Sequence, residues 1–233
     1  VFRGDYAVSF LGLAVAKTSF QTTIKDGRFS ISGSASSTGL AEIFDPTSGS
    51  IRANGRFSGK ATRPDAYQVD YVMGKKAKST RVTFSGGNVA KTVNQPPLRK
   101  KPNWVPVTKA NLNAVMDPIS ASLIRAESLG EVCGRTVKVY DGEMRADLQL
   151  GPGSTQPINM AGYKGEAITC TAKFVPVAGY RAGHRSIEYL KNRARITIMF
   201  APLGETGIYA PIRATVSTQI GPITVQARRF EAL

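Results

Sequence analysis

The stretch "FQTTIKDGRFSISGSA", residues 20–35, has the pattern that decides the fold. Apolar or β-branched side chains alternate with polar ones on both sides of its centre, as Phe29 and Ile31 illustrate after the centre. Asp26-Gly27 lies between the two runs and supplies the positive φ angles that a two-residue hairpin turn requires. This alternation is typical of antiparallel strands that bury one face and leave the other in water.

The same pattern recurs along the chain. Gly86-Gly87 separates "STRVTFS" from "VAKTV", and Asp141-Gly142 separates "RTVKVY" from "EMRADLQL". Further strand-like runs occupy residues 167–177, 193–202, 211–220 and 223–233. We therefore expect about ten to twelve strands joined as consecutive hairpins, which is an all-β, antiparallel meander and not a βαβ fold. A meander of this length must curl to protect its edges, so we expect a β-spiral or an open barrel.

One segment, residues 108–126, interrupts the strands with a helical pattern. Thr108 is a candidate N-cap, and Asp117-Pro118 suits a second helix start, because Asp caps helices and Pro fits the first turn. We expect two short helices or one kinked helix here, as a helical insert in the β fold. Its apolar residues fall at helical spacing, and their shared face should line or plug the concavity of the sheet: Leu112, Val115, Met116, Ile119 and Leu123.

The chain is expected to form one domain, residues 1–233. The proline-rich segment 94–106 is expected to be an extended crossover and not a domain boundary, and residues 37–44 also suit a short helical turn. No run approaches the ~20 apolar residues of a transmembrane helix, so we expect a protein that is not transmembrane. Because the sequence opens on Val1 and not on Met, we expect that an N-terminal targeting segment was removed.

The charge balance is strongly basic, with 31 Lys and Arg against 16 Asp and Glu. Nucleic-acid binding is not expected, because the helical segment carries only Lys109 and Arg125 and no aromatic residues interleave with the basic ones. The charge instead suits contact with an anionic surface, such as lipid head groups or acidic cell-wall polymer, and the alternative is a solvated surface without a charged partner. The candidate contact residues form two groups: Lys75, Lys76, Lys78, Arg81, Arg99, Lys100 and Lys101.

The first of these groups raises a question of register. Lys76 and Lys78 fall on the same side of the expected strand as Val82, which should point to the core, whereas Arg81 falls on the other side. Either this end of the strand projects beyond the core, or a bulge shifts the register.

Candidate catalytic residues are few. The single histidine, His184, lies in the Gly- and Arg-rich stretch "GYRAGHRS", which is typical of a solvated loop, and no phosphate-binding loop or dinucleotide motif is present. We therefore expect no enzymatic activity and no cofactor. Cys133 and Cys170 are compatible with one disulfide or with two buried thiols, and a metal site is less compatible with them because close ligand spacing is missing. A disulfide would indicate an oxidising compartment.

Several blocks, in this order, resemble one bacterial family: "GSIRANGRF", "VPVTKANLNAVMDPISASLI" and "CGRTVKVYDGEMRADLQL" are three of them. This is the domain of unknown function numbered thirty-one-oh-eight, which is found in exported proteins of Gram-negative bacteria. The resemblance implies a periplasmic, mainly β protein made with a signal peptide, and it implies no established activity. More distantly, the sequence is similar in style to the envelope integrity protein B family, a spiral β protein with a disulfide that supports the outer envelope.

These observations give a ranked set of functional hypotheses. The first is a non-enzymatic periplasmic protein of cell-envelope maintenance, with a lipid or a cell-wall ligand bound in the concave sheet. The second is a scaffold that recruits an envelope partner through an edge strand or the helix. The third is a cell-wall polymer hydrolase, which would depend on His184 or Asp147.

Overall fold

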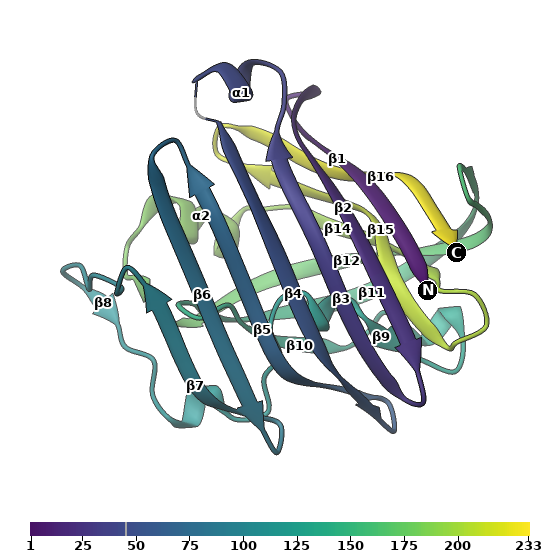
Figure 1. The fold of residues 1–233 in the computed structure, drawn as a ribbon, viewed down its shortest axis with the longest axis horizontal. Coiled ribbons are helices and arrows are strands. Elements are labelled where there is room, and N and C mark those ends of the chain that lie inside the picture. The colour runs from purple at the N-terminus through teal and green to yellow at the C-terminus, as the bar shows by residue number, and fades with distance from the viewer. Residues whose placement is uncertain (45) are drawn as a thin grey trace.

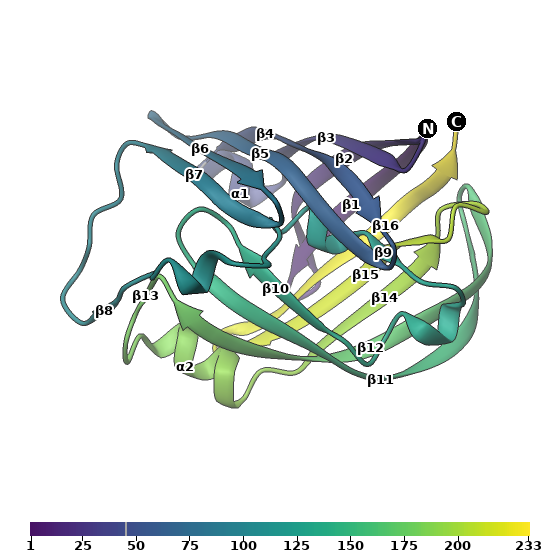
Figure 2. The same cartoon turned by 90° about the horizontal axis from the view of Figure 1, so that it is seen from below.

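One antiparallel sheet folds back on itself to form two facing layers, as Figure 1 and Figure 2 show. The protein is seen here in a computed structural model that describes residues 1–44 and 46–233. The first layer contains β1 (Phe2–Phe10), β2 (Leu13–Lys25), β3 (Arg28–Ser37), β4 (Thr47–Ser58), β5 (Ala61–Met73), β6 (Lys76–Ser85) and β7 (Asn88–Gln95). The second contains β10 (Thr136–Tyr140), β11 (Arg145–Met160), β12 (Tyr163–Ala178), β14 (Ile196–Pro202), β15 (Ile208–Thr218) and β16 (Gly221–Ala232).

The strand order is β10-β11-β12-β14-β15-β16-β1-β2-β3-β4-β5-β6-β7, so the first and last strands of the chain pair in the middle of the sheet. A short strand, β9 (Ile124–Arg125), pairs with β15, and β8 (Trp104–Val105) pairs with β13 (Tyr180–Arg181) in a separate ribbon. The sheet is open, because β7 and β10 end the order without pairing to each other. The predicted antiparallel meander that curls into an open barrel is thereby confirmed.

The hairpin that opened the sequence analysis forms as predicted. Asp26 and Gly27 both have positive φ angles, 50° and 72°, and connect β2 to β3. Phe29 and Ile31 are buried, whereas Ser30 and Ser32 between and after them are exposed. The face that carries Ile31 looks toward the other layer, and we call it the inner face of the first layer.

The segment predicted as a helical insert, residues 108–126, differs from the prediction. It holds two single 3-10 turns, Ala110–Leu112 and Ser120–Ser122, in place of α-helices. Between them Ala114 has a positive φ of 51°, and Met116 gives its backbone groups to β10, accepting from Tyr140 N and donating to Lys138 O. These hydrogen bonds to another strand replace those that a helix would need within the segment.

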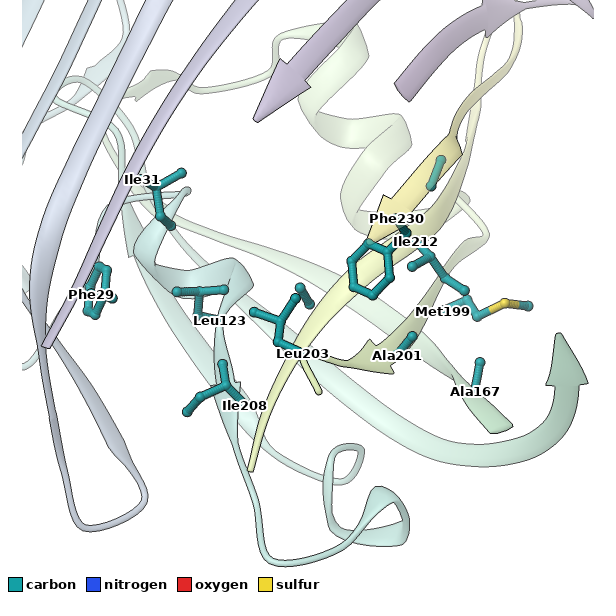
Figure 3. Packing of buried hydrophobic residues seen from close by; sticks show 12 residues of the cluster. Phe29, Ile31, Leu123, Ala167, Met199, Ala201, Leu203, Ile208, Ile212 and Phe230 are labelled. Atoms are coloured by element: carbon teal, nitrogen blue, oxygen red, sulfur yellow. The ribbon is translucent and has the colours of Figure 1, made fainter. Parts of the chain in front are cut away.

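Residues 110–126 are not α-helical, but they lie between the two layers. We call this segment the plug. Val115 and Leu123 are 1% and 3% exposed. Figure 3 shows Leu123 between Ile31 of the first layer and Ile208 of the second layer. Burial of side chains of this size contributes roughly 1.5 to 3 kcal/mol each, so the plug is a main source of cohesion between the layers.

Two α-helices lie outside this arrangement. The short α1 (Leu40–Phe44) connects β3 to β4 in the region where a helical turn was expected. The second, α2 (Arg185–Asn192), lies beside β12 and β15, in a stretch that the sequence analysis interpreted as a loop. A third 3-10 turn, Leu129–Glu131, precedes the cysteine at position 133. Within the described residues, no helix has the length and hydropathy needed to span a membrane.

Cys133 and Cys170 form a disulfide, with 5.5 Å between their Cα atoms. The bond connects the segment before β10 to the middle of β12, where Cys170 is fully buried. Of the two pairing states that the sequence left open, the structure therefore has the bridged one.

Candidate ligand-binding cavity

A row of six residues crosses the inner face of β1 to β6 near the end of the sheet that carries α1. Directly paired residues of neighbouring strands project to the same face, so the register defines this row. One outer position is aromatic, the two at the other end are aromatic and charged, and the three central positions are small. We call it the open row: Tyr6, Thr18, Ala35, Gly49, Tyr71 and Lys78.

A second row crosses β2 to β7, and on the five strands that both rows share it lies four residues from the open row. It carries larger side chains and lies against the plug, whose Val115 packs against Tyr67 and Val82. We call it the packed row: Thr22, Ile31, Ala53, Tyr67, Val82 and Thr92. The four hydrophobic members are at most 6% exposed, whereas Ala35 in the open row is exposed even though it projects to the inner face.

A cavity of about 520 Å³ lies over three members of the open row, Ala35, Gly49 and Tyr71, and over residues between the two rows. Apolar side chains provide eight of its lining residues, one of them from α1: Val15, Ala16, Phe20, Ala35, Ala41, Ile51, Val69 and Tyr71. The other lining residues are small or polar: Ser34, Ser36, Ser37, Thr47, Ser48, Gly49, Ser50 and Asp70. Small residues create the space, because a Cβ at Gly33 would lie 2.5 Å from the ring of Phe20, and a Cβ at Gly49 would lie 2.8 Å from Tyr71 Cβ. Gly33 thus lets the Phe20 ring lie flat against the sheet as a wall of the cavity.

A second apolar cavity, of about 340 Å³, lies on the inner face of the second layer beneath the plug. Most of its lining comes from four strands and from the plug: Pro118, Ala121, Val139, Leu148, Phe174, Ile198 and Phe200. The interior is therefore filled by side chains at the packed row and hollow on both inner faces beside it.

The plug is fixed by polar anchors at both of its turns. Asp117 Oδ1 accepts hydrogen bonds from the backbone N of Ile119 at 3.0 Å and of Ser120 at 2.8 Å, so Asp117 caps the second turn as the sequence predicted. The side chain is fully buried, its Oδ2 has no hydrogen-bond partner among the described residues, and burial raises the pKa of the carboxyl. At Leu123, the backbone oxygen accepts from Thr62 Oγ1 of β5 at 2.8 Å.

Arg145 is the other anchor, and no pattern in the sequence singled it out. Its guanidinium is buried, donates from Nε to Asn111 O at 3.0 Å, and pairs through Nη1 with Asp147 Oδ1 at 2.6 Å. Its neighbourhood in sequence, an exposed-face position after a hairpin turn, resembles that of many surface arginines. The alternation of apolar residues in β11 assigns Ala146 to the buried face and Arg145 to the opposite, exposed face. In the structure both residues are buried, and a register shift between them accompanies this.

Two side-chain hydrogen bonds connect the free edges of the sheet at the level of the packed row. Thr92 Oγ1 lies 3.2 Å from Tyr140 Oη, and Asn94 Nδ2 donates to Gly142 O at 3.0 Å. These contacts draw β7 toward β10 and its following turn, and so close the interior beside the plug without backbone pairing between the two edges.

The register question at β6 is resolved, because β5 and β6 pair without a shift from Met73–Lys76 to Ala66–Thr83. The end of β6 therefore projects beyond the core, with Lys78 on the inner face beside Tyr71 and Arg81 on the outer face. All seven basic candidates are exposed. The pKa of Glu143 is raised, mainly by burial and also by the charge of Asp141. The positive charges of Lys78 and Lys101 oppose this shift, so both lysines interact electrostatically with Glu143. No contact described for Arg99 or Lys100 joins them to this group.

The largest hollow, about 1100 Å³, lies on the outer face of the first layer. It follows a row of side chains that can form hydrogen bonds, with one residue on each strand from β1 to β7. Each residue pairs directly with the next: Asp5, Ser19, Ser34, Ser50, Asp70, Ser79 and Gln95. We call this the outer trough. Its side chains are more polar than those of the inner cavities, although the backbone and side chains of the open row also contribute to its lining.

Of the two candidate catalytic residues, His184 lies outside the cavities, whereas Asp147 is part of the lining of the second cavity. His184 is exposed, directly precedes α2, and makes no side-chain cap on that helix. Asp147 forms an ion pair with Arg145, and the two cysteines form a disulfide with each other. In residues 1–44 and 46–233, no group of three or more His, Cys, Asp or Glu side chains is placed to hold a metal ion.

Comparisons with known proteins identify a family and a fold. Residues 5–228 match the family described as "Protein of unknown function (DUF3108)", which is the family that the sequence resembles. No curated protein matches the chain. The crystal structure of a β-barrel-like protein of the domain of unknown function DUF1849 from Brucella abortus is similar over 100% of this chain and 97% of that chain, with a TM-score of 0.57 and 8% identity. At this identity the likeness concerns the fold alone.

A second solved structure, the hypothetical protein CT021 from Chlamydia trachomatis, aligns over 99% of this chain and 91% of that chain. Its TM-score is 0.31 and its identity 10%.

Proposed function

Since the chain belongs to the DUF3108 family, whose description gives no activity, we propose its function from the inner cavities: it is a non-enzymatic binding protein of the bacterial periplasm. It holds the acyl chain of a lipid on the inner face of the sheet and contributes in this way to maintenance of the cell envelope. The observation that carries the proposal is the 520 Å³ apolar cavity beside the open row, next to a packed row whose hydrophobic members are buried.

The size and lining of the cavity support an acyl ligand. Small-molecule sites are concave, mostly apolar and about 300 to 1,000 Å³ in volume. Each methylene group moved from water into such a site contributes about 0.8 kcal/mol, so a chain of ordinary length gains enough to bind without polar contacts. A natural core avoids open apolar volume unless something occupies it, because unfilled space lowers stability.

The disulfide supports the compartment. Cys133–Cys170 is typical of proteins that fold under oxidising conditions, which in Gram-negative bacteria means outside the cytoplasm. The periplasm is the compartment that the family resemblance implies, and it is also where an acyl-chain carrier would meet the membrane lipids of the envelope.

The test fills the cavity with a large side chain and compares ligand binding with that of a variant that carries the same side chain on the outer face. Ala35→Trp places an indole in the cavity, and Ser32→Trp, on the same strand, places one on the outer face. Delipidated protein is titrated with a long-chain fluorescent fatty acid, and native mass spectrometry records any lipid that co-purifies from a Gram-negative host. We expect Ala35→Trp to weaken binding about tenfold or more and Ser32→Trp to leave it within about twofold.

Equal binding by both variants would refute the inner cavity as the site. Absence of fatty-acid binding to the wild-type protein, together with purification free of lipid, would refute the function itself.

A cell-wall polymer is the second candidate ligand, and the outer trough favours it. Its row of hydroxyl, carboxylate and amide groups repeats at the strand spacing of about 4.8 Å, so it offers regularly spaced hydrogen-bonding partners to an extended polar chain. Co-sedimentation with purified wall material distinguishes the candidates, because Ser34→Trp and Ser50→Trp would abolish it while Ala35→Trp would not. Co-sedimentation that neither outer variant reduces would exclude the trough.

A further inference from the structure

We infer that the ligand of the inner cavity carries an anionic head group, bound at the Lys78 end of the open row. This inference rests on the proposed function and specifies the class of its ligand as a single-chain anionic amphiphile, with a carboxylate or a phosphate at one end.

The first step is the position of Lys78. It is the direct cross-strand neighbour of Tyr71, a residue of the cavity lining, and both project to the inner face. Neighbouring strands lie about 4.8 Å apart, so Lys78 lies next to Tyr71 at the border of the cavity, although it is not itself part of the lining, and a flexible side chain of this length can bring its ammonium group to a ligand there. The open row therefore passes from small apolar positions, through an aromatic residue, to a cation.

The second step is that this cation forms no ion pair. The ion pairs formed within residues 1–44 and 46–233 do not include Lys78. Asp70 of the neighbouring strand projects to the opposite face of the sheet, and Glu143 feels the charge of Lys78 without pairing with it. An unpaired ammonium at the end of an apolar cavity is complementary to an anion at the end of an apolar chain.

The third step is the charge around Lys78. Lys75 and Lys76 belong to the turn and strand end immediately before it, and Lys101 lies close enough to share its influence on Glu143. The acidic groups closest in the fold to these lysines include Asp141 and Glu143, together with Asp70 on the opposite face of the sheet. Four lysines against these three carboxyls leave a net positive potential, which favours a singly or doubly charged anion over a zwitterionic or neutral head group.

The experiment compares three ligands that share one saturated alkyl chain and differ only in the head group: a fatty acid, an alkyl phosphate and an alcohol. Affinities are measured by competition against the fluorescent fatty acid, in wild type, in Lys78→Gln and in Arg81→Gln. The last variant removes the same charge from the same strand, but from its outer face. Circular dichroism verifies that all three proteins are folded.

We expect wild type and Arg81→Gln to bind both anions about two- to fivefold more tightly than the alcohol, and Lys78→Gln to lose this preference while its affinity for the alcohol stays the same. The preference should also decrease at high salt. A stronger preference for the phosphate than for the fatty acid would indicate a phospholipid-type source, and the reverse a free fatty acid.

The outcomes separate the two proposals. If all three ligands bind wild type equally, or if Arg81→Gln loses the preference as Lys78→Gln does, the head-group inference is wrong and the cavity remains a lipid site. If none of them binds wild type, the proposed function itself fails.

Discussion

The packed row and the open row share five strands, β2 to β6, and lie on the same face, yet one is core and the other borders a cavity. Opposite the packed row lies the plug, and the row itself contributes Ile31, Tyr67 and Val82. The cavity lies over the centre of the open row, where Ala35 and Gly49 are small. The comparison teaches that strand pairing alone does not determine what a sheet encloses. Side-chain size along each row, and a segment inserted between the layers, determine it.

The largest effect should follow from removing the disulfide, which connects the segment before β10 to β12 beneath the plug. Replacing both Cys133 and Cys170 with Ala frees a loop of 37 positions, and loop-closure entropy predicts a loss of about 3 to 4 kcal/mol in the free energy of unfolding. Urea unfolding of wild type under oxidising and reducing conditions gives the same comparison without mutation. If the reduced protein is as stable as the oxidised one, the bond does not stabilise the fold.

A matched pair of truncations measures the difference between the rows directly. Val82 in the packed row is 0% exposed, and Val69 lines the cavity and is half-buried. Val82→Ala should lower the free energy of unfolding by about 2 kcal/mol, whereas Val69→Ala should cost less than about 1 kcal/mol, because its methyl groups already face unfilled space. Chemical denaturation of both variants decides it, and equal losses would mean that the cavity side is as tightly packed as the plug side.

Asp117 should make the plug sensitive to pH. Burial raises the folded-state pKa of this carboxyl above its ordinary value of 3.8, so its stabilising effect is full at low pH and is lost as the pH rises through the folded-state pKa. Asp117→Asn keeps an oxygen that caps Ser120 and removes the ionisation. We expect the wild-type protein to lose on the order of 1 kcal/mol more than the variant between acidic and neutral pH. Unfolding curves across that range test this, and parallel pH profiles would contradict it.

The smallest effect should come from a cluster of exposed ion pairs between the β4–β5 turn and the segment that follows the plug. Lys60 Nζ, in the turn between β4 and β5, lies 3.3 Å from Glu127 Oε1 and 3.0 Å from Glu131 Oε2. Lys60→Met should lower the melting temperature slightly at low salt, because it removes two exposed ion pairs between the layers. In about 1 M NaCl, where the screening length is about 3 Å, wild type and variant should melt alike. A difference that persists in salt would mean that the Lys60 stem contributes by packing.

The sequence predicted the sheet well because its signals are local. Asp26-Gly27 and the alternation around Ile31 specify one hairpin without reference to any other part of the chain. The capping role of Asp117 was local as well, and it was predicted correctly. The plug was mistaken for helix because the partner that changes its conformation is β10, whose edge accepts Met116 in place of helical hydrogen bonds.

The candidate site was less predictable, for the same reason. Ala35 and Gly49 are ordinary small residues in sequence, and they define a cavity only because the register aligns them in one row. Lys78 appeared in the sequence as one of seven basic candidates, and the structure distinguishes it from Arg81 by the face to which each projects. Pairing between distant residues, which no local pattern encodes, separates a site from a surface here.

The meeting of the first and last strands has a consequence for how the protein comes to be folded. Phe2 pairs with Ala232, so the seam between the two layers joins residues from opposite ends of the chain. Most hairpins can form locally and early, but this seam must wait until the last strand is available, and closing so long a loop is entropically unfavourable. The two arms of the sheet can therefore acquire structure independently, and the interior between them is enclosed only in the final step of folding.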